Sequence, residues 1–408
     1  MRKCNNWLDS YMLYSAPSEA PDSFHTWCGL SAIATALQRK VYFDMKFFKI
    51  FTNMYIVLVA PAGRARKTSA ILIALGLINE LPDVHISADA TTREALIRAI
   101  KLCERIIDPG NGKMYTHSSI TVYSKELSVF LGTGNHDLLS LLTDLYDSPD
   151  RWEYRTKNSG IDNIYGVWLN ILAASTPSWL VGSIPITAIG GGFTSRVIFI
   201  VENDVRHRNP FPELNEKLKA DLISDLEIIS TIAGSFSITA EARDWFKDWY
   251  LKSNIPIDDL RFSGYSERRH IHLKKVAMLI SVCKNSDKII TLQDIKEALN
   301  LINQIEKKML NAFGSTGRNP FAPDIGVIVE TIKNAGGWMR RSDMIRGVWR
   351  DVNTRELDGI MTTLDQMGIV KTRVGAGGTI VYELREATED KSSEIKNIGE
   401  IKDGRIGQ

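Results

Sequence analysis

Residues 57–69 read Val-Leu-Val-Ala-Pro-Ala-Gly-Arg-Ala-Arg-Lys-Thr-Ser, and the fold that the sequence predicts depends on this stretch. It joins an apolar run at 55–60, which suits a buried strand, to an apolar helical segment at 69–79. A loop in this position can bind phosphate, because its backbone N–H groups and the helix N-terminus both face the anion. Lys67 is then expected to reach the terminal phosphates and Thr68 to hold Mg²⁺.

This phosphate loop departs from the usual glycine pattern. Pro61 stands at the first glycine position and Arg66 at the glycine before the lysine, so Gly63 alone takes a positive φ without cost. A basic loop that binds no nucleotide is therefore the alternative interpretation. The residues expected to contact nucleotide form one continuous run, Pro61, Ala62, Gly63, Arg64, Ala65, Arg66, Lys67, Thr68 and Ser69.

Strands and helices alternate after residue 55. Further strands are expected at 84–87, 119–123, 168–174 and 196–201, and helices at 92–103 and 137–145. Such alternation is typical of a largely parallel sheet covered by helices on both faces. The predicted fold class is therefore α/β.

Two more residues suit ATP hydrolysis. Glu126 follows the third strand, where a carboxylate would orient the attacking water, although Ser124 and Lys125 replace the Mg²⁺-binding aspartate expected before it. Arg196 enters the fifth strand after a run of glycines and suits an arginine finger that reaches the γ-phosphate of a neighbouring subunit. The alternatives are a surface glutamate and an arginine that caps a helix end.

The order of these motifs resembles the AAA+ core of the MCM-type helicases. The segment 195–199, Ser-Arg-Val-Ile-Phe, is similar to the Ser-Arg-Phe finger segment of that group, and 172–176, Leu-Ala-Ala-Ser-Thr, is similar to its sensor 1 strand. The resemblance implies that Thr176 or Ser175 contacts the water or the γ-phosphate, while turn formation before Pro177 is the alternative.

A closer resemblance is to an uncharacterised family of phage and mobile-element proteins. These proteins combine a divergent Arg-Lys-Thr phosphate loop with a Gly-Gly-Gly-Phe-x-Ser-Arg segment, found here at 190–196. The two resemblances together cover about residues 5–310. Residues 210–313 are expected to be all-helical and to resemble the AAA+ lid, in which Arg268 or Arg269 would contact nucleotide.

The ribbon expected at 152–165 lies where MCM-type helicases carry the pre-sensor hairpin, whose basic tip enters the ring pore. Arg155, Lys157 and Asn158 would offer two cations and an amide to successive DNA phosphates, a contact that ignores sequence. A solvated turn is the alternative, because Asn-Ser-Gly is good turn chemistry.

The C-terminal unit reads as a winged helix-turn-helix over 324–386. Arg355, Lys371 and Arg373 are placed where a recognition helix and a wing would meet phosphate. Acidic residues are interleaved with the basic ones throughout this unit, so contact with another protein is the alternative.

Length and composition agree with several domains and a cytoplasmic location. The chain has 408 residues and a formal net charge of +2, so any contact with nucleic acid depends on local patches. No signal peptide or membrane span is expected. Four scattered cysteines suit reduced thiols, Cys4, Cys28, Cys103 and Cys283. The expected divisions are an N-terminal helical region 1–50, a P-loop core 51–209, a helical lid 210–313, a linker 314–323, a winged helix 324–386 and a disordered tail 387–408.

Two functions fit these features. The first is an ATP- and Mg²⁺-dependent DNA motor, a replicative helicase of a phage or mobile element that assembles as a homo-oligomeric ring, expected to be a hexamer, on single- or double-stranded DNA. The second is a degenerate ATPase core that acts as a DNA-binding replication initiator or loader. Either would work in the bacterial or phage-infected cytoplasm, beside other replication proteins.

Overall fold

The computed structural model describes residues 2–87, 89–107, 114–132, 135–156, 160–183, 192–252, 262–309, 312, 322–348, 354–374 and 379–385. The chain divides into two compact units, Met1–Gly314 and Ser315–Gln408. This division falls at the beginning of the linker expected at 314–323, most of which lies outside the described residues. The tail expected at 387–408 also lies outside them.

A central sheet organises the first unit. Its parallel strands stand in the order β10 (Val197–Val201), β3 (Tyr55–Val59), β9 (Val167–Ser175), β6 (Tyr115–Ser124) and β4 (Ile86–Ser87). A further strand, β5 (Glu104–Ile107), runs antiparallel to β6. The strands β3, β9 and β10 are buried along their whole length, as expected for a sheet with both faces covered. The α/β class and the largely parallel sheet are confirmed.

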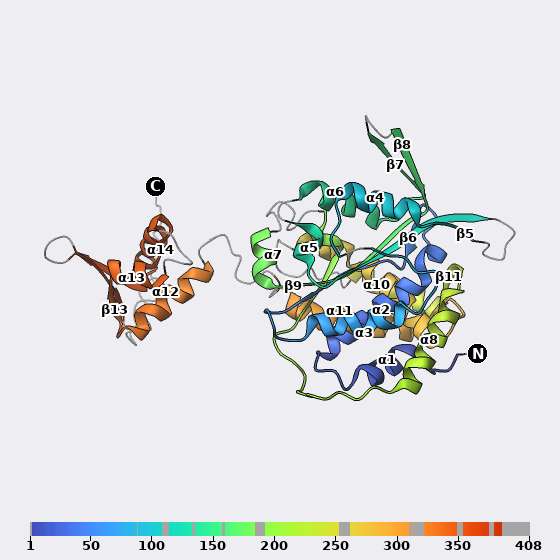
Figure 1. Cartoon of the computed structure of the whole chain (residues 1–408), viewed down its shortest axis with the longest axis horizontal. Coiled ribbons are helices and arrows are strands. Elements are labelled where there is room, and N and C mark those ends of the chain that lie inside the picture. The colour runs from blue at the N-terminus through green and yellow to red at the C-terminus, as the bar shows by residue number, and fades with distance from the viewer. Residues whose placement is uncertain are drawn as a thin grey trace, which may run out of the picture. The chain divides into compact units, whose positions relative to one another are not determined.

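The helices lie on both faces of this sheet. Helix α3 (Lys67–Ile78) packs beside α2 (Asp22–Leu37) on one face, and α4 (Arg93–Leu102) and α6 (His136–Tyr146) cover the other (Figure 1). The chain leaves β3 toward the far strand β4 but leaves the adjacent β9 toward β10, on the other side of β3. Ligands of open α/β sheets bind where neighbouring strands send their connections in opposite directions. The carboxyl ends of β3 and β9 are such a point.

The N-terminal helices belong to the same core. Helix α1 (Trp7–Ser15) and α2 pack against α8 (Glu216–Ser230), where the indole N–H of Trp7 donates to the carbonyl oxygen of Leu222 at 3.0 Å. Nearly every residue of α2 is buried. The helices expected between 7 and 40 are therefore present.

A small second sheet corrects the expectation that 210–313 is all-helical. It has the order β12 (Ile289–Ile290), β11 (Gly234–Ile238), β1 (Val41–Asp44) and β2 (Lys49–Phe51). It lies with helices α9 (Ala240–Lys252), α10 (Ser263–Lys284) and α11 (Leu292–Met309). Strand β11 is short, and its partner β1 lies almost two hundred residues earlier in the chain, so no local pattern reveals the pairing. The sheet also shows that 1–50 is not wholly helical.

Two β-hairpins extend from the amino-terminal end of the central sheet. One consists of β7 (Arg151–Thr156) and β8 (Gly160–Tyr165), which confirms the ribbon expected at 152–165 (Figure 1). The other, formed by β5 with the first half of β6, was not expected. The turn into β9 requires Gly166, because φ is +58° and an added Cβ would lie 2.3 Å from the carbonyl oxygen of Thr116.

The second unit has its own core. The elements are α12 (Ala322–Asn334), β13 (Trp338–Arg340), α13 (Arg341–Val348), α14 (Thr354–Gln366), β14 (Val370–Val374) and β15 (Ile380–Leu384). The three strands form an antiparallel sheet in the order β13-β15-β14. The helices and the last two strands expected for 324–386 are present, whereas β13 was not expected.

No helix in the described part of the chain combines the length and apolar character needed to span a membrane.

Candidate functional site

The phosphate loop joins β3 to α3 with an unusual backbone. Gly63, Ala65 and Arg66 have φ values of +70°, +35° and +48°. The left-handed region costs a non-glycine residue roughly 1 kcal/mol or more, so two of the three residues hold the loop under strain. The side chain of Ala65 is fully buried and anchors the loop against the core.

The first turn of α3 presents free N–H groups to this loop. Arg66 is the N-cap residue, and its side chain makes no capping hydrogen bond. The first N–H groups of a helix have no partner within the helix, and the helix dipole makes that end positive. Because the Arg66 side chain does not cap the N-terminus of α3, a phosphate group could accept from these N–H groups.

Lys67 points back into the loop. Its Nζ donates to the carbonyl oxygens of Ala60 at 2.6 Å and Pro61 at 3.1 Å. Burial lowers the pKa of Lys67, and the carboxylate of Glu126 partly opposes that effect. Among the described residues Lys67 makes no ion pair, so a bound phosphate would supply the missing counter-charge.

Arg66 forms an ion pair outside the loop. Its Nε lies 2.6 Å from Oε2 of Glu19, and Oε1 of Glu19 accepts from the backbone N–H of Asn209 at 3.0 Å. These two hydrogen bonds, that of Asn209 first, lower the pKa of Glu19. Two segments far apart in sequence are thereby attached to the phosphate loop.

A cavity of about 450 Å³ lies at this junction. Arg66, Ser69 and Ile73 form the wall on the side of α3, and the segments 14–19 and 209–214 form the other walls. Arg206 fastens these segments, since its guanidinium donates to the carbonyl oxygens of Ser15 and Ser18. The volume is within the range of small-molecule sites and is large enough for a nucleoside.

Glu126 lies at the same edge of the sheet, after β6. Its side chain is exposed, whereas the neighbouring Ser124 is buried and donates its hydroxyl to the carbonyl oxygen of Glu126 at 2.8 Å. Lys125 lies 3.8 Å from Asp89. Glu126 is therefore an exposed carboxylate just after β6, and its negative charge partly opposes the lowering of the Lys67 pKa.

The described part of the chain provides no dedicated metal cage beside these groups. Within the part of the chain that the structure describes, no cluster of three or more histidine, cysteine, aspartate or glutamate side chains could hold a metal ion. Mg²⁺ commonly binds proteins through one or two side chains together with substrate phosphates. The exposed Thr68 hydroxyl, on the first turn of α3, fits that manner of binding.

Ser175 ends β9 and Thr176 follows it, beside the phosphate loop. The backbone N–H of Ala60 donates to the carbonyl oxygen of Ser175 at 3.3 Å, which ties the loop to this strand. The hydroxyl of Thr176 accepts from the backbone N–H of Trp179 at 3.3 Å and so caps α7 (Pro177–Ser183). The observed contact of Thr176 is therefore the turn chemistry considered as the alternative for this residue.

Arg196 lies at the amino-terminal end of the parallel strands, the end opposite to the phosphate loop. It ends the short helix η2 (Thr194–Arg196) immediately before β10, and Val197 of β10 pairs with Tyr55, the first residue of β3. Lys67 follows the other end of β3. A strand of five residues spans about 13 Å, so Arg196 cannot reach a phosphate held by its own loop.

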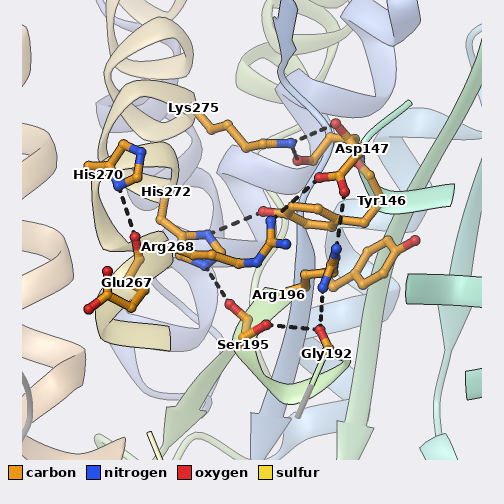
Figure 2. A network of polar contacts seen from close by, with 12 residues as sticks. Tyr146, Asp147, Gly192, Ser195, Arg196, Glu267, Arg268, His270, His272 and Lys275 are labelled. Carbon is orange, nitrogen blue, oxygen red and sulfur yellow. Dashed lines mark hydrogen bonds and ion pairs between the residues drawn. The ribbon is translucent and has the colours of Figure 1, made fainter. Parts of the chain in front are cut away.

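Arg196 and Arg268 share one carboxylate. Nη2 of Arg196 lies 3.0 Å from Oδ2 of Asp147, and Nη1 of Arg268 lies 3.5 Å from Oδ1 (Figure 2). Arg269 instead pairs with Glu306 at 2.7 Å inside the helical layer. Neither Arg268 nor Arg269 lines the cavity beside the phosphate loop.

A buried histidine positions this arginine segment. His272 of α10 contacts both η2 and α6. Its Nε2 lies 3.2 Å from the carbonyl oxygen of Ser195, and its Nδ1 lies 3.3 Å from the hydroxyl of Tyr146. Burial lowers the pKa of His272 to about 3, so the ring is neutral, with Nε2 donating and Nδ1 accepting. This arrangement connects η2, α6 and α10.

The residues expected to bind DNA are only partly described. Lys157 and Asn158 lie outside the described residues, as do the side chains of Arg155 and Arg355. Lys371 is exposed on β14. Arg373 pairs with Glu383 of the adjacent strand at 2.6 Å, so its charge is balanced within the unit.

Sequence reasoning missed Glu19 and Asp147 as members of these clusters. Each lies far in sequence from the arginines that it contacts, and although Glu19 belongs to a segment, 19–21, that is similar to the phage and mobile-element family, no sequence pattern indicates its pairing with Arg66. Comparison of the chain with models of known protein families and with curated proteins finds no match.

Proposed function

We propose that this chain is a P-loop ATPase of the AAA+ type, related to the MCM-type helicases, whose active site is completed by a second copy. The observation that carries the proposal is the placement of two groups. Lys67 lies at the carboxyl edge of the central sheet, whereas Arg196 lies at its amino edge. A site that needs both groups must draw them from two copies of the chain.

The loop and the cavity together support the proposal of nucleotide binding. The free N–H groups at the start of α3 and the ammonium of Lys67 would hold the phosphates of ATP. The cavity lined by Arg66 and Ser69 would hold the nucleoside. Thr68 would bind Mg²⁺, which neutralises negative charge on the phosphates when bound.

Glu126 would orient the attacking water. Its carboxylate is exposed at the end of β6 and acts electrostatically on Lys67, as expected for a group close to the terminal phosphate. Ser124 donates to the backbone in place of binding metal. Mg²⁺ would then depend on Thr68 and on the oxygens of the nucleotide itself.

A ring is the assembly that we propose for such shared sites. An interface that joins the carboxyl edge of one copy to the amino edge of the next is heterologous, and such interfaces close into rings when the rotation permits. Arg196 and Arg268 would both face the nucleotide of the neighbouring copy. The hexamer remains the proposed assembly.

Action on DNA is the second part of the proposal. The hairpin of β7 and β8 extends from the amino-terminal end of the sheet. Beside this hairpin, the guanidinium carbon of Arg93 lies 4.9 Å from the ring centroid of Tyr154 of β7. The sequence between β7 and β8 includes Lys157, and a hairpin with a basic connection would suit a contact with the backbone of single-stranded DNA. We therefore favour a replicative helicase of a phage or mobile element.

The second candidate is a DNA-binding initiator or loader with a degenerate ATPase core. The motif departures at Arg66 and Ser124 favour it. A winged helix over 324–386 would then carry the DNA contact. The internal ion pairs of this unit, Arg341 with Asp358 and Arg373 with Glu383, instead reduce the cationic charge available to DNA.

ATP turnover by the purified full chain tests the proposal. Turnover should rise with single-stranded DNA and should be lost in Lys67→Ala, while Lys217→Ala, a change at an exposed lysine of α8, should leave it unchanged. A folded wild-type protein with no turnover, and with duplex binding that Lys67→Ala does not alter, would favour the initiator.

A further inference from the structure

Asp147 occupies an unusual position for a carboxylate. It is the C-cap residue of α6, where the negative end of the helix dipole disfavours an acidic side chain. Two guanidinium groups compensate, Arg196 at 3.0 Å and Arg268 at 3.5 Å, one on each carboxylate oxygen. Figure 2 shows both guanidinium groups directed at this one carboxylate.

Positive charge exceeds negative charge around Asp147. Two guanidinium groups face one carboxylate, and Lys275 is a third basic group in the cluster, whose buried Nζ donates to the backbone and side-chain oxygens of Asn53, each at 2.7 Å. Burial lowers the pKa of Lys275 to about 7; Asp147 opposes this effect, and Arg268 and Arg196 add to it. The cluster therefore lacks negative charge.

Among the described residues, one donor of Arg196 has no acceptor. Its side chain is 10% exposed, and one terminal nitrogen donates to the carbonyl oxygen of Gly192 at 2.6 Å. Its Nε is buried and has no acceptor among the described residues. By contrast, the Asp147 side chain is 59% exposed and can turn toward solvent.

An open space adjoins the cluster. A cavity of about 360 Å³ is lined by Asp147, Arg268, Lys275 and Lys49 together with apolar side chains of β2 and α10. This cavity is distinct from the one beside Lys67, with which it shares no lining residue. An anion can therefore approach Arg268 without disturbing the phosphate loop of the same copy.

We propose that Asp147 holds the place of a phosphate group: its carboxylate pairs with Arg196 and Arg268 in an isolated copy, and the terminal phosphate of a nucleotide bound to a neighbouring copy displaces it. This inference rests on the proposed function. A phosphate group offers more negative charge and more acceptor oxygens than one carboxylate, so the exchange satisfies donors that Asp147 leaves unused. Asp147 is thus a positioning residue, which keeps the two arginines paired and aligned until nucleotide arrives.

Binding of inorganic tripolyphosphate tests the displacement directly. The titration uses the full chain carrying Lys67→Ala, which weakens the binding of anions by the protein's own loop. Adding Asp147→Asn should lower the dissociation constant roughly five- to tenfold, because a competing charge is removed. Asp144→Asn is the matched control, since it removes an exposed carboxylate of the same helix that contacts neither arginine.

The gain must disappear when Arg268→Ala is added to Asp147→Asn. Equal dissociation constants for the Asp147→Asn and Asp144→Asn proteins would overturn the proposal. So would a lower midpoint of thermal unfolding in Asp147→Asn without any change in tripolyphosphate affinity, which would mark Asp147 as purely structural.

A second measurement separates this inference from the proposed function. In the protein with an intact Lys67, Asp147→Asn should lower the ATP concentration that is needed for assembly. Sedimentation velocity measures the assembly. If Asp147→Asn tightens tripolyphosphate binding but the chain never hydrolyses ATP, the proposal of an anion site at Asp147 stands and the proposal of an ATPase is rejected. Normal, DNA-stimulated hydrolysis with no effect of Asp147→Asn on assembly or on tripolyphosphate affinity would reject the displacement alone.

Discussion

The guanidinium of Arg66 lies 2.6 Å from the carboxylate of Glu19, so the residue that replaces a glycine in the phosphate loop is attached to the segment between α1 and α2. Arg66 has a φ of +48°, a conformation that normally favours glycine. The ion pair with Glu19 holds the Arg66 side chain in place despite this backbone strain. Glu19 also accepts from the backbone of Asn209, so one carboxylate joins three walls of the cavity.

Glu19→Gln should therefore weaken ATP binding more than it destabilises the fold. The ion pair is open to solvent, so its loss should change the free energy of unfolding little. Loss of the anchor should raise the dissociation constant for ATP about three- to tenfold, measured by titration calorimetry. Glu213→Gln changes a glutamate of the same cavity and serves as the control; equal affinities in the two variants would show that the pair does not support the site.

Glu126→Gln should separate binding from hydrolysis. The amide keeps the size of the side chain but cannot act on the attacking water as a base, a role that contributes about 10²–10⁴-fold to rates. We expect turnover to fall by about that factor, while the dissociation constant for ATP changes little. Glu80→Gln, at an exposed glutamate that follows α3, should retain full turnover. Equal turnover in the two variants would remove Glu126 from the mechanism.

The stability of the first unit should fall in mild acid. Burial lowers the pKa values of His25 and His117 to about 4 and that of His272 to about 3, from an ordinary value of 6.5. Below pH 6.5 the unfolded chain therefore binds protons that the folded chain does not, and stability is lost as the pH falls toward 4. Each histidine contributes up to about 1.4 kcal/mol per pH unit over that window.

Urea unfolding at pH 7, 6 and 5 measures this dependence. His117→Gln should reduce the slope of the unfolding free energy against pH by the contribution of one histidine, whatever the substitution does to stability at pH 7. The exposed His207→Gln should leave the slope unchanged. A His117→Gln protein with the wild-type slope would show that this histidine is not the buried neutral group described above.

A chain that ends at Gly314 should retain its ATPase activity. Every group assigned to the nucleotide site, and Arg196 as well, belongs to the first unit, and the second unit has a separate core. We expect turnover within about twofold of that of the full chain. A loss of duplex binding in the shortened chain would assign that contact to the second unit, whereas a loss of turnover in a folded protein would mean that the second unit acts on the site.

The sequence predicted those parts of the fold that depend on local patterns. The apolar run before the phosphate loop became β3, and the ribbon expected at 152–165 became β7 and β8, because strand, turn and helix signals lie within the segments themselves. The parallel pairing of β1 with β11 escaped prediction, since its energy comes from residues nearly two hundred positions apart.

The site was predictable in its motifs and unpredictable in its contacts. Lys67 and Glu126 follow the parallel strands β3 and β6, so topology alone places them at the same end of the sheet, although β9 lies between the two strands. The partners of Arg196 and Arg66 could not be foreseen, because Asp147 and Glu19 are joined to them only by tertiary packing. The hydroxyl of Thr176 shows a related limit, since the same residue type serves as a helix cap and as a phosphate contact.

Mixing two inactive variants tests most directly whether the active site is shared between copies. Lys67→Ala and Arg196→Ala should each hydrolyse ATP at less than about 1% of the wild-type rate, as expected when a group that stabilises the transition state is lost. In an equal mixture, an Arg196→Ala copy supplies an intact Lys67 and a Lys67→Ala copy supplies an intact Arg196. We predict that turnover of the mixture rises to roughly a quarter of the wild-type rate, since about one interface in four would then pair two intact groups. A mixture as inactive as its components, or an Arg196→Ala protein that hydrolyses ATP at the wild-type rate, would contradict the account.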